Sequence, residues 1–258
     1  MTTVIDYSTG PPSAAEIKAA GHVGAVRYLR KKGSSNVVTL TAAEVLDFQA
    51  HGLLLALTYE DPAKDWMAGG RDIGIDRAKW ALEQARAVGI EHPRCIYLCH
   101  DAHATAGQVA LVMECLDGAR TVLGAATGIY GFPEVVGAAM AGGHADRFWQ
   151  CGRRGDVLPG THLYQRNNEQ IAVAGITCDI DDVLEPDWGQ HDLSGEDPEE
   201  INMKIIDCPN KPALLLAGTV QALTNAQRDA LRGVGVPAQR VDAEAHAALF
   251  SLAKAHSG

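Results

Sequence analysis

The feature that most limits what this chain can fold into is a regular alternation of short apolar runs with helix-like segments. The runs that we expect to form strands cover residues 4–7, 25–29, 53–59, 95–100, 126–130, 147–150 and 171–178. Strands that alternate with helices form a parallel sheet, and about eight such units over roughly 180 residues favour a closed barrel. We therefore predict an α/β fold, a (β/α)8-like TIM barrel. An open doubly wound sheet is the alternative, although no phosphate-binding GxGxxG motif follows the first run.

Several of the expected helices carry start and stop signals. Residues 13–16 (Ser-Ala-Ala-Glu) and 41–44 (Thr-Ala-Ala-Glu) fit the capping box, in which hydroxyl and Glu side chains satisfy backbone N–H groups at the start of a helix. Gly52 stands where the second of these helices is expected to end. Apolar residues at helical spacing predict further helices over 73–88 and 108–123.

The composition changes after the last expected strand. Residues 182–200 form an acidic, Pro-containing stretch that is typical of a linker. We therefore predict a barrel domain over 1–195 and a small accessory unit over 200–258. The expected order in that unit is β-β-α-β-α, with strands at 203–207, 213–217 and 239–241 and helices opening at Thr224 and Asp242. A unit this small is expected to dock on the barrel.

Charge and hydropathy exclude some classes of function. The chain has 22 Lys and Arg against 32 Asp and Glu, a formal net charge of −10, and its longest basic run is residues 30–32. A nucleic-acid partner would meet net repulsion, so we expect none. No window approaches the ~20 apolar residues that cross a bilayer, so we expect no membrane partner. Residues 1–6 lack the regions of a signal peptide, so we expect any export to use another route.

The six cysteines are few for 258 residues and include no CxxC pair. Neither a disulfide scaffold nor a zinc finger is indicated. We expect buried thiols and no cofactor.

Acidic residues follow several of the expected strands. Asp6, Glu60, Asp101, Asp179 and Asp181 stand at or just after the ends of these runs. In a parallel barrel the carboxyl ends of the strands share one face, where active sites lie, so we predict a carboxylate-based acid/base site. Each residue also has a simpler interpretation as a helix N-cap, a position that Asp commonly takes.

Two further interpretations concern the neighbours of these acids. His100 and His103 flank Asp101. Together with an Asp of the last strand, these residues have the side chains that bind a divalent metal. His and Asp at a strand end more often share hydrogen bonds, so we predict no metal. Trp149 and Gln150 have the chemistry to stack on a sugar ring and bond its hydroxyls, but a Trp at a strand end is at least as often core.

Several motifs together resemble a known family. They are residues 6–10 (Asp-Tyr-Ser-Thr-Gly) with 12–13, 26–29, 59–60, 96–101, 128–131 (Gly-Ile-Tyr-Gly), and 148–150 followed by Asp179. This set resembles the glycoside-hydrolase-like domain of unknown function found in actinobacterial exported proteins and their phages. That domain is similar to the family 25 lysozymes, whose (β/α) barrel cleaves peptidoglycan. The resemblance covers roughly residues 3–190, and the tail after 200 more weakly resembles a small terminal unit of phage lysins and tail proteins.

The resemblance implies roles for individual residues. It implies acidic groups at Asp6, Glu60, Asp101 and Asp179 around a sugar-binding cleft. From the acids at the strand ends together with the resemblance, we predict Asp101 and Glu60 as the catalytic acid/base pair. The residues that we predict to bind substrate are Asp6, Tyr28, His103, Tyr130, Trp149, Gln150, Asp179 and Asp181. His103 stands where the lysozymes have a catalytic Glu, two residues after the Asp of the fourth strand. A histidine donates protons near pH ~6.5 but is not the usual acid of a glycosidase, so activity stays open, with Glu60 as a substitute acid.

Three functions remain open from the sequence. The favoured one is a glycoside-hydrolase-like barrel acting on or gripping cell-wall polysaccharide, with a phage lysin, made in the host cytoplasm and acting on the wall, as one form. The second is a catalytically silent, glycan-binding barrel in a phage virion, associated with the tail and with other virion proteins. The third is a cytosolic metabolic enzyme, since one barrel fold hosts many functions.

Overall fold

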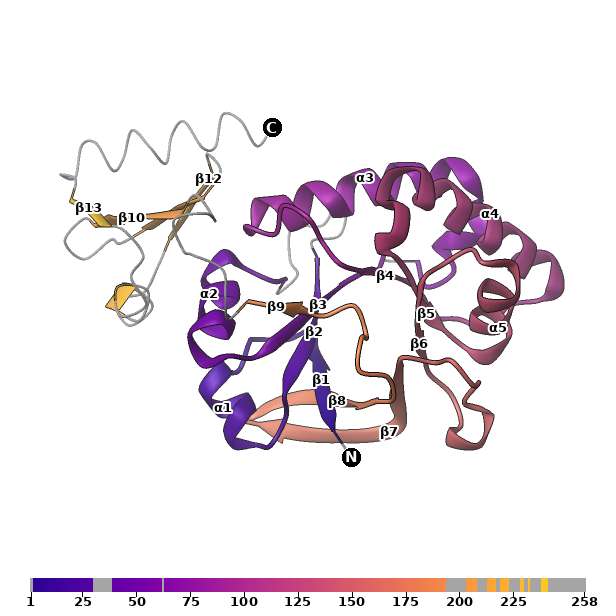
Figure 1. Cartoon of the computed structure of the whole chain (residues 1–258), viewed down its shortest axis with the longest axis horizontal. Coiled ribbons are helices and arrows are strands. Elements are labelled where there is room, and N and C mark those ends of the chain that lie inside the picture. Colours follow the sequence, from indigo (N-terminus) through magenta and orange to yellow (C-terminus); the bar gives the residue numbers. More distant parts are fainter. Residues whose placement is uncertain are drawn as a thin grey trace.

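The structure is a computed structural model that describes residues 2–29, 39–61 and 63–193, and within the C-terminal region 203–207, 213–216, 219–222, 228–229, 232 and 238–240. In the first three ranges, eight strands close into a barrel (Figure 1). Strands β1 to β7 run parallel to one another around it, and β8 is antiparallel to both β7 and β1. The TIM-barrel-like fold predicted from the sequence is confirmed.

Most expected strands are present within one or two residues of their predicted bounds. The barrel strands are β1 Thr3–Tyr7, β2 Gly24–Tyr28, β3 Leu54–Tyr59, β4 Ile96–His100, β5 Thr127–Gly131, β6 Arg147–Gln150, β7 Leu163–Val173 and β8 Ile176–Val183. The expected single strand at 171–178 is wrong. The chain reverses at Ala174 and Gly175, where φ is 51° and 82°, so this run is the tip of a β7–β8 hairpin.

In the described barrel, an α-helix follows each of the strands β1 to β5, but none follows β6, β7 or β8. The α-helices are α1 Ala14–Ala19, α2 Ala42–His51, α3 Arg71–Ala87, α4 Ala106–Leu123 and α5 Pro133–Gly142. Short 3-10 turns are η1 Trp66–Gly69, η2 Gly124–Ala126 and η3 Arg154–Asp156. The described chain therefore has fewer strand–helix units than the sequence pattern predicted. An antiparallel β8 follows β7 through a tight turn, whereas a parallel strand would need a crossover of a dozen or more residues.

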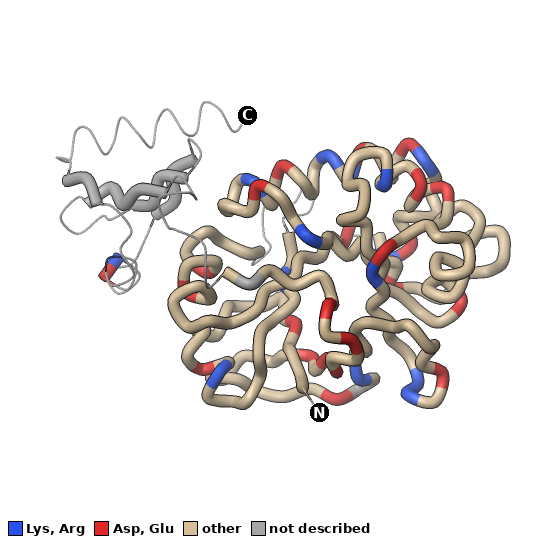
Figure 2. The backbone as a smooth tube through the Cα atoms, viewed as in Figure 1, with Lys and Arg blue, Asp and Glu red and all other residues tan. Residues whose placement is uncertain are grey.

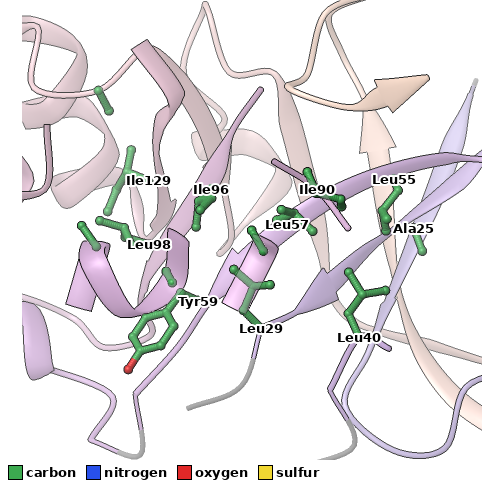
Figure 3. Packing of buried hydrophobic residues seen from close by; sticks show 14 of the residues in the cluster. Ala25, Leu29, Leu40, Leu55, Leu57, Tyr59, Ile90, Ile96, Leu98 and Ile129 are labelled. Carbon is green, nitrogen blue, oxygen red and sulfur yellow. The ribbon is translucent and has the colours of Figure 1, made fainter. Parts of the chain in front are cut away.

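Two hydrophobic clusters lie on the two sides of the barrel wall. The outer cluster fills the space between strands and helices, with Leu55, Leu57, Ile96, Leu98 and Ile129 at its centre (Figure 3). The lumen cluster consists of Val4, Val26, Ala56, Cys95, Tyr97, Cys99, Tyr130, Trp149, Cys151, Leu163 and Trp188. Side chains alternate along a strand, so residues two positions beyond these on the same strands also face the lumen, nearer the carboxyl ends.

A buried ion pair ties α2 to β2 behind the barrel wall. Arg27 is fully buried, and its Nε lies 2.5 Å from Oε1 of Glu44, which also accepts a 2.7 Å hydrogen bond from the Tyr7 hydroxyl. The guanidinium also lies over the Tyr7 ring at 4.0 Å from its centroid. This corrects one capping prediction. Thr41 caps α2, but the Glu44 carboxylate binds Arg27, whereas the box at Ser13 and Glu16 is complete.

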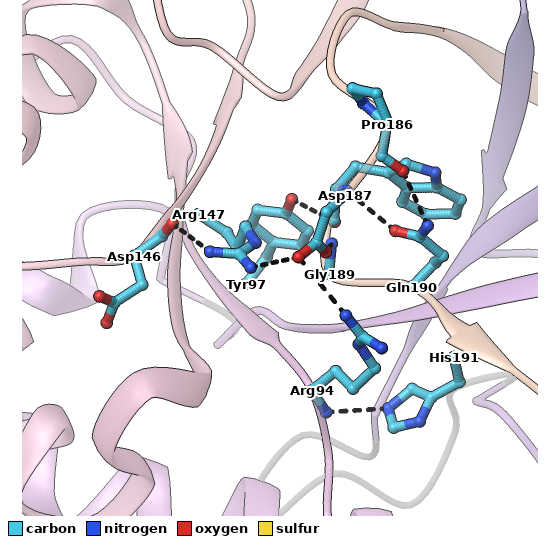
Figure 4. Close-up of polar contacts among 10 residues, drawn as sticks. Arg94, Tyr97, Asp146, Arg147, Pro186, Asp187, Gly189, Gln190 and His191 are labelled. Carbon is cyan, nitrogen blue, oxygen red and sulfur yellow. Dashed lines mark hydrogen bonds and ion pairs between the residues drawn. The ribbon is translucent and has the colours of Figure 1, made fainter.

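The segment after β8 closes the amino end of the barrel. Trp188 is buried in the lumen cluster, and its carbonyl oxygen accepts a 2.7 Å hydrogen bond from the Tyr97 hydroxyl. The carboxylate of Asp187 forms ion pairs with Arg147 and Arg94, as Figure 4 shows. Strand β9 (His191–Asp192) then pairs with the start of β3. Residues 182–193 are thus part of the barrel rather than of a linker, and 194–200 lie outside the described residues.

The described C-terminal residues form a separate sheet of four strands, in the order β12-β11-β10-β13. Its strands are β10 Met203–Asp207, β11 Ala213–Leu216, β12 Thr219–Ala222 and β13 Ala238–Arg240, and β12 was not predicted. The starts of the helices expected at Thr224 and Asp242 lie outside the described residues. The division of the chain into two domains stays a prediction.

Three sequence expectations about chemistry can be compared with this fold. Five cysteines are buried and free, as expected, while Cys208 lies outside the described residues. Among the described residues, no helix combines the length and apolar character needed to cross a membrane. In the view of Figure 2, Lys and Arg are interspersed with Asp and Glu rather than gathered on one face.

Candidate functional site

A hydrogen-bonded network of inward-facing side chains lies at the carboxyl rim of the barrel, just beyond the lumen cluster. Asp6 at the end of β1 is at its centre. Its two carboxyl oxygens accept hydrogen bonds from the Tyr28 hydroxyl at 3.0 Å and from Nε2 of Gln165 at 2.7 Å. The Tyr130 hydroxyl donates to Oε1 of the same Gln165 at 2.6 Å. Four strands, β1, β2, β5 and β7, are thereby connected across the rim.

The carboxyl groups of Asp6 and Asp181 are both buried and interact electrostatically. Burial first, and the charge of Asp179 second, raise the pKa of Asp6 to about 7. Burial and the neighbouring Asp6 also raise the pKa of Asp181, whose Oδ1 accepts a 2.8 Å hydrogen bond from Nε1 of Trp149. Two like charges this close inside a protein repel, so the pair retains a proton well above the usual carboxyl range.

Asp6 gives the fold a pH dependence that Asp6→Asn should reduce. Folding raises the pKa of Asp6 from its ordinary value of 3.8 to about 7, so the folded state alone keeps the proton between these pH values. The stabilisation is complete below pH ~4 and is lost as the pH rises towards 7, at about 1.4 kcal/mol per pH unit. In urea denaturation, Asp6→Asn should therefore gain stability relative to wild type from pH 4 to 7.

Asp182 provides a control of opposite sign for that measurement. Burial acts to raise its pKa, but hydrogen bonds from Arg166 and Arg154 outweigh this and lower it. Asp182→Asn should therefore destabilise the protein at pH 7 and lose that effect as the pH falls below ~4. If the difference in stability between Asp6→Asn and wild type stays constant from pH 4 to 7, Asp6 is ionised in the folded protein over that range.

The two residues predicted to be catalytic lie on neighbouring strands with part of their surface open to solvent. Asp101 follows β4 and forms an ion pair with Nζ of the exposed Lys64. Glu60 follows β3 and stands four residues beyond the lumen residue Ala56, so strand alternation places it on the lumen side. The catalytic roles of Asp101 and Glu60 stay predictions.

His103, two residues beyond Asp101, lies on the surface of the rim. Its Nδ1 is 2.9 Å from Oε1 of Glu134, and its ring stacks on Phe132 at a centroid distance of 3.9 Å. Burial acts to raise the pKa of Glu134, but backbone N–H groups and His103 outweigh this and lower it. His103 is therefore held beside an ionised carboxylate.

The remaining predicted binding residues are less open to a ligand. Trp149 is 1% exposed and packs on Tyr130 and Tyr97, so its indole positions Asp181 rather than offering a face to solvent. Gln150 is fully buried, and its amide binds the backbone of Asp156 and Leu158. Asp179 pairs with Asp6 in the β1–β8 register and accepts a hydrogen bond from Gln170. Their part in substrate binding stays a prediction.

The metal alternative does not fit this geometry. His100 is fully buried, and strand alternation places it on the helix side of β4, with the outer cluster, while His103 binds Glu134. Burial lowers the pKa of His100. In the part of the chain that the structure describes, no group of three or more His, Cys, Asp or Glu side chains is placed to hold a metal ion.

The sequence analysis missed three polar residues of the rim: Lys64, Glu134 and Gln165. Glu134 follows Pro133 in the first turn of α5, a position where an acid is ordinary, so nothing marked it. Gln165 lies two residues beyond the lumen residue Leu163, and a correct assignment of β7 from Leu163 would have placed it inward.

Comparison with known proteins gives consistent matches. The family model described as "Rv2525c-like, glycoside hydrolase-like domain" matches residues 15–183. The "Putative peptidoglycan hydrolase Rv2525c" of Mycobacterium tuberculosis (strain ATCC 25618 / H37Rv) is 28% identical over 202 residues, which cover 74% of this chain and 84% of that protein.

Two crystal structures of the Mycobacterium tuberculosis Tat-secreted protein Rv2525c are similar to the barrel. One is a complex with HEPES and the other a complex with L-tartrate, with TM-scores of 0.67 and 0.68. Both are 28% identical to this chain and cover 73% of it and 98% of the solved chain.

Proposed function

This chain belongs to the family described as Rv2525c-like, glycoside hydrolase-like domain, and from that premise we propose that its carboxyl rim binds the glycan of bacterial peptidoglycan and hydrolyses a glycosidic bond in it. Asp101 and Glu60 are the two carboxylates that we assign to the bond. Asp6, Tyr28, Tyr130 and Asp181 form the polar floor beneath them. The name of the relative, which describes a peptidoglycan hydrolase, supports the choice of substrate.

The observation that carries this proposal is the convergence of acids from separate strands on one rim. Burial raises the pKa of both Asp6 and Asp181 in the floor, and Glu60 and Asp101 directly follow the two neighbouring strands β3 and β4. Glycosidases act with carboxyl groups in different protonation states on the two sides of the bond. A rim with this many acids supports chemistry of that kind better than a purely structural role.

A second candidate function is glycan binding without cleavage. The observation that favours it is the ion pair between Lys64 and Asp101, which occupies one of the two carboxylates that hydrolysis needs. The buried position of the proton-carrying Asp6, which is 1% exposed, also keeps that proton from a bound sugar. Stacking and hydrogen bonds at the rim would suffice for binding alone.

Incubation of the full chain with purified bacterial peptidoglycan at pH 4 to 8 tests both candidates. New reducing ends support hydrolysis, and co-sedimentation with the insoluble glycan measures binding. Asp101→Asn should lower the hydrolysis rate by roughly 10²–10⁴-fold, the range for a lost acid/base group, with little change in melting temperature.

Glu83→Gln on the exposed side of α3 is a matched control and should leave rate and binding unchanged. Binding without reducing ends would establish the second candidate. A protein that neither sediments with the glycan nor releases reducing ends would contradict both.

We further propose that the protein acts at the cell wall, outside the cytoplasm. The support is the description of the relative as Tat-secreted, a route that contrasts with our expectation of no signal peptide. The proteins compared above are bacterial, so the roles as a phage lysin or tail protein rest on the sequence resemblance alone. Mass spectrometry of purified phage particles against that of bacterial culture supernatants decides between these sources.

A further inference from the structure

We propose that His103 and Glu134 form an acid/base dyad in which His103 donates the proton to the leaving glycosidic oxygen and Glu134 positions its ring. This inference rests on the hydrolysis proposed above and names the proton donor for it. It gives the rim a donor other than its carboxyl groups.

The Glu134 carboxylate fixes the orientation and tautomer of the His103 ring. An ionised carboxylate only accepts hydrogen bonds, so at 2.9 Å from Glu134 Oε1 the Nδ1 atom carries the proton. The backbone N–H of Ala104 donates to the same oxygen at 3.1 Å and holds the carboxylate in place. The ring nitrogen left for a substrate is therefore Nε2, the arrangement in which a carboxylate-bound histidine acts as acid or base.

Phe132 supports the ring from one face. The two rings stack with centroids 3.9 Å apart and planes inclined by 29°. Phe132 itself packs against the lumen cluster, so the imidazole stacks on a side chain that is held in the barrel. Such preorganisation is what a proton donor needs to meet a substrate in a fixed geometry.

Accessibility separates His103 from the proton-carrying carboxyl group of Asp6. The His103 side chain is 77% exposed, whereas Asp6, which keeps a proton near neutral pH, is 1% exposed. Glu134 is ionised, and the neighbouring Cys151 thiol, whose pKa burial raises to about 12, stays neutral. The charged groups near the dyad include Glu134 on α5 and, two residues before His103, Asp101 with its ion-pair partner Lys64.

The proposed step balances with water as the only co-reactant. The proton on Nε2 of the imidazolium passes to the glycosidic oxygen as the C1–O bond breaks, and the bonding electron pair goes to that oxygen. A water molecule adds to C1 through its oxygen and gives a proton to a carboxylate of the rim, Glu60 or Asp101. Solvent then returns a proton to His103 and takes one from the carboxylate.

The test compares reducing-end release from peptidoglycan by full-length variants across pH 4 to 8. His103→Gln keeps a polar side chain without a titrating proton and should lose roughly 10²–10⁴-fold in rate. Glu134→Gln should lower the rate by about tenfold. It should also move the limb of the pH–rate profile that depends on the imidazolium, because a positioning carboxylate stabilises that charged form. His103→Glu should retain part of the rate with its optimum moved towards acid.

A second histidine–carboxylate pair provides the matched control. His144 Nδ1 lies 2.6 Å from Asp117 Oδ1, just ahead of β6 at the amino end of the barrel. His144→Gln should therefore leave both the rate and the pH profile unchanged. Nitrogen-15 NMR of the imidazole checks the tautomer separately, because wild type should show the proton on Nδ1 and Glu134→Gln should lose that preference.

The outcomes separate this inference from the proposed function. Hydrolysis by His103→Gln at the wild-type rate and pH profile would overturn the dyad and leave the glycosidase proposal intact. If wild type binds peptidoglycan but releases no reducing ends at any pH, the dyad is overturned and glycan binding without cleavage remains as the function. Absence of both binding and hydrolysis would refute the proposed function itself, and the dyad with it.

Discussion

Glu44→Ala should lower the free energy of unfolding by about 3–5 kcal/mol, the range for breaking a buried ion pair. Glu44 is 6% exposed and Arg27 is fully buried, so the substitution leaves a guanidinium without its carboxylate and away from water. The Tyr7 hydroxyl loses its acceptor at the same time. Urea denaturation followed by circular dichroism measures the effect.

Two further variants show whether the ion pair is the cause. Glu83→Ala removes an exposed acid from α3 and should change stability by less than ~0.5 kcal/mol. The double variant Arg27→Met with Glu44→Leu removes both charges and should recover much of the loss, because no unpaired charge remains. A free energy of unfolding for Glu44→Ala within ~0.5 kcal/mol of the wild-type value would mean that another partner or water stabilises Arg27.

Trp188→Ala should destabilise the barrel by about 3–5 kcal/mol, the usual range for truncating a buried Trp. Trp188 is 1% exposed and belongs to the lumen cluster, where it closes the amino end of the barrel. The Tyr97 hydroxyl depends on the Trp188 carbonyl oxygen, so the loss of packing also loosens a hydrogen bond inside the lumen. Thermal melting and urea denaturation should agree on the loss.

Leu184→Ala is the control from the same segment. Leu184 is 37% exposed, so its truncation should cost less than ~1 kcal/mol. Equal effects of the two variants would mean that the segment contributes through its backbone, and that Trp188 adds little to the core.

The barrel could be predicted from the sequence because each strand from β1 to β6 is a short apolar run between recognisable helix signals. The direction of β8 could not, since Ala174 and Gly175 reverse the chain inside what looked like one continuous strand. Asp6 was found by its place at a strand end, but its partner Asp181 needed the antiparallel register to be seen as a pair. Strand-end position alone therefore identified individual acids better than their pairing.

The same reasoning explains which interactions of the site stayed hidden. His103 binds Glu134 across 31 residues of sequence, and only the closing of β4 against β5 brings them together. Lys64 and Asp101 are a similar case across 37 residues. Contacts of this kind depend on tertiary packing, which a local pattern of apolar and polar residues does not encode.

The pairing of β1 with β8 also sets the order in which the molecule can assemble. Thr3 pairs with Asp182, so almost the whole barrel sequence lies between the two strands that complete it. During synthesis on the ribosome, β1 emerges first but has to wait for β8 before its second edge is covered. The β7–β8 hairpin can form locally, whereas the final closure is a long-range event and is expected to be slow. Until then β1 presents an open edge, and an open strand edge favours pairing with other chains.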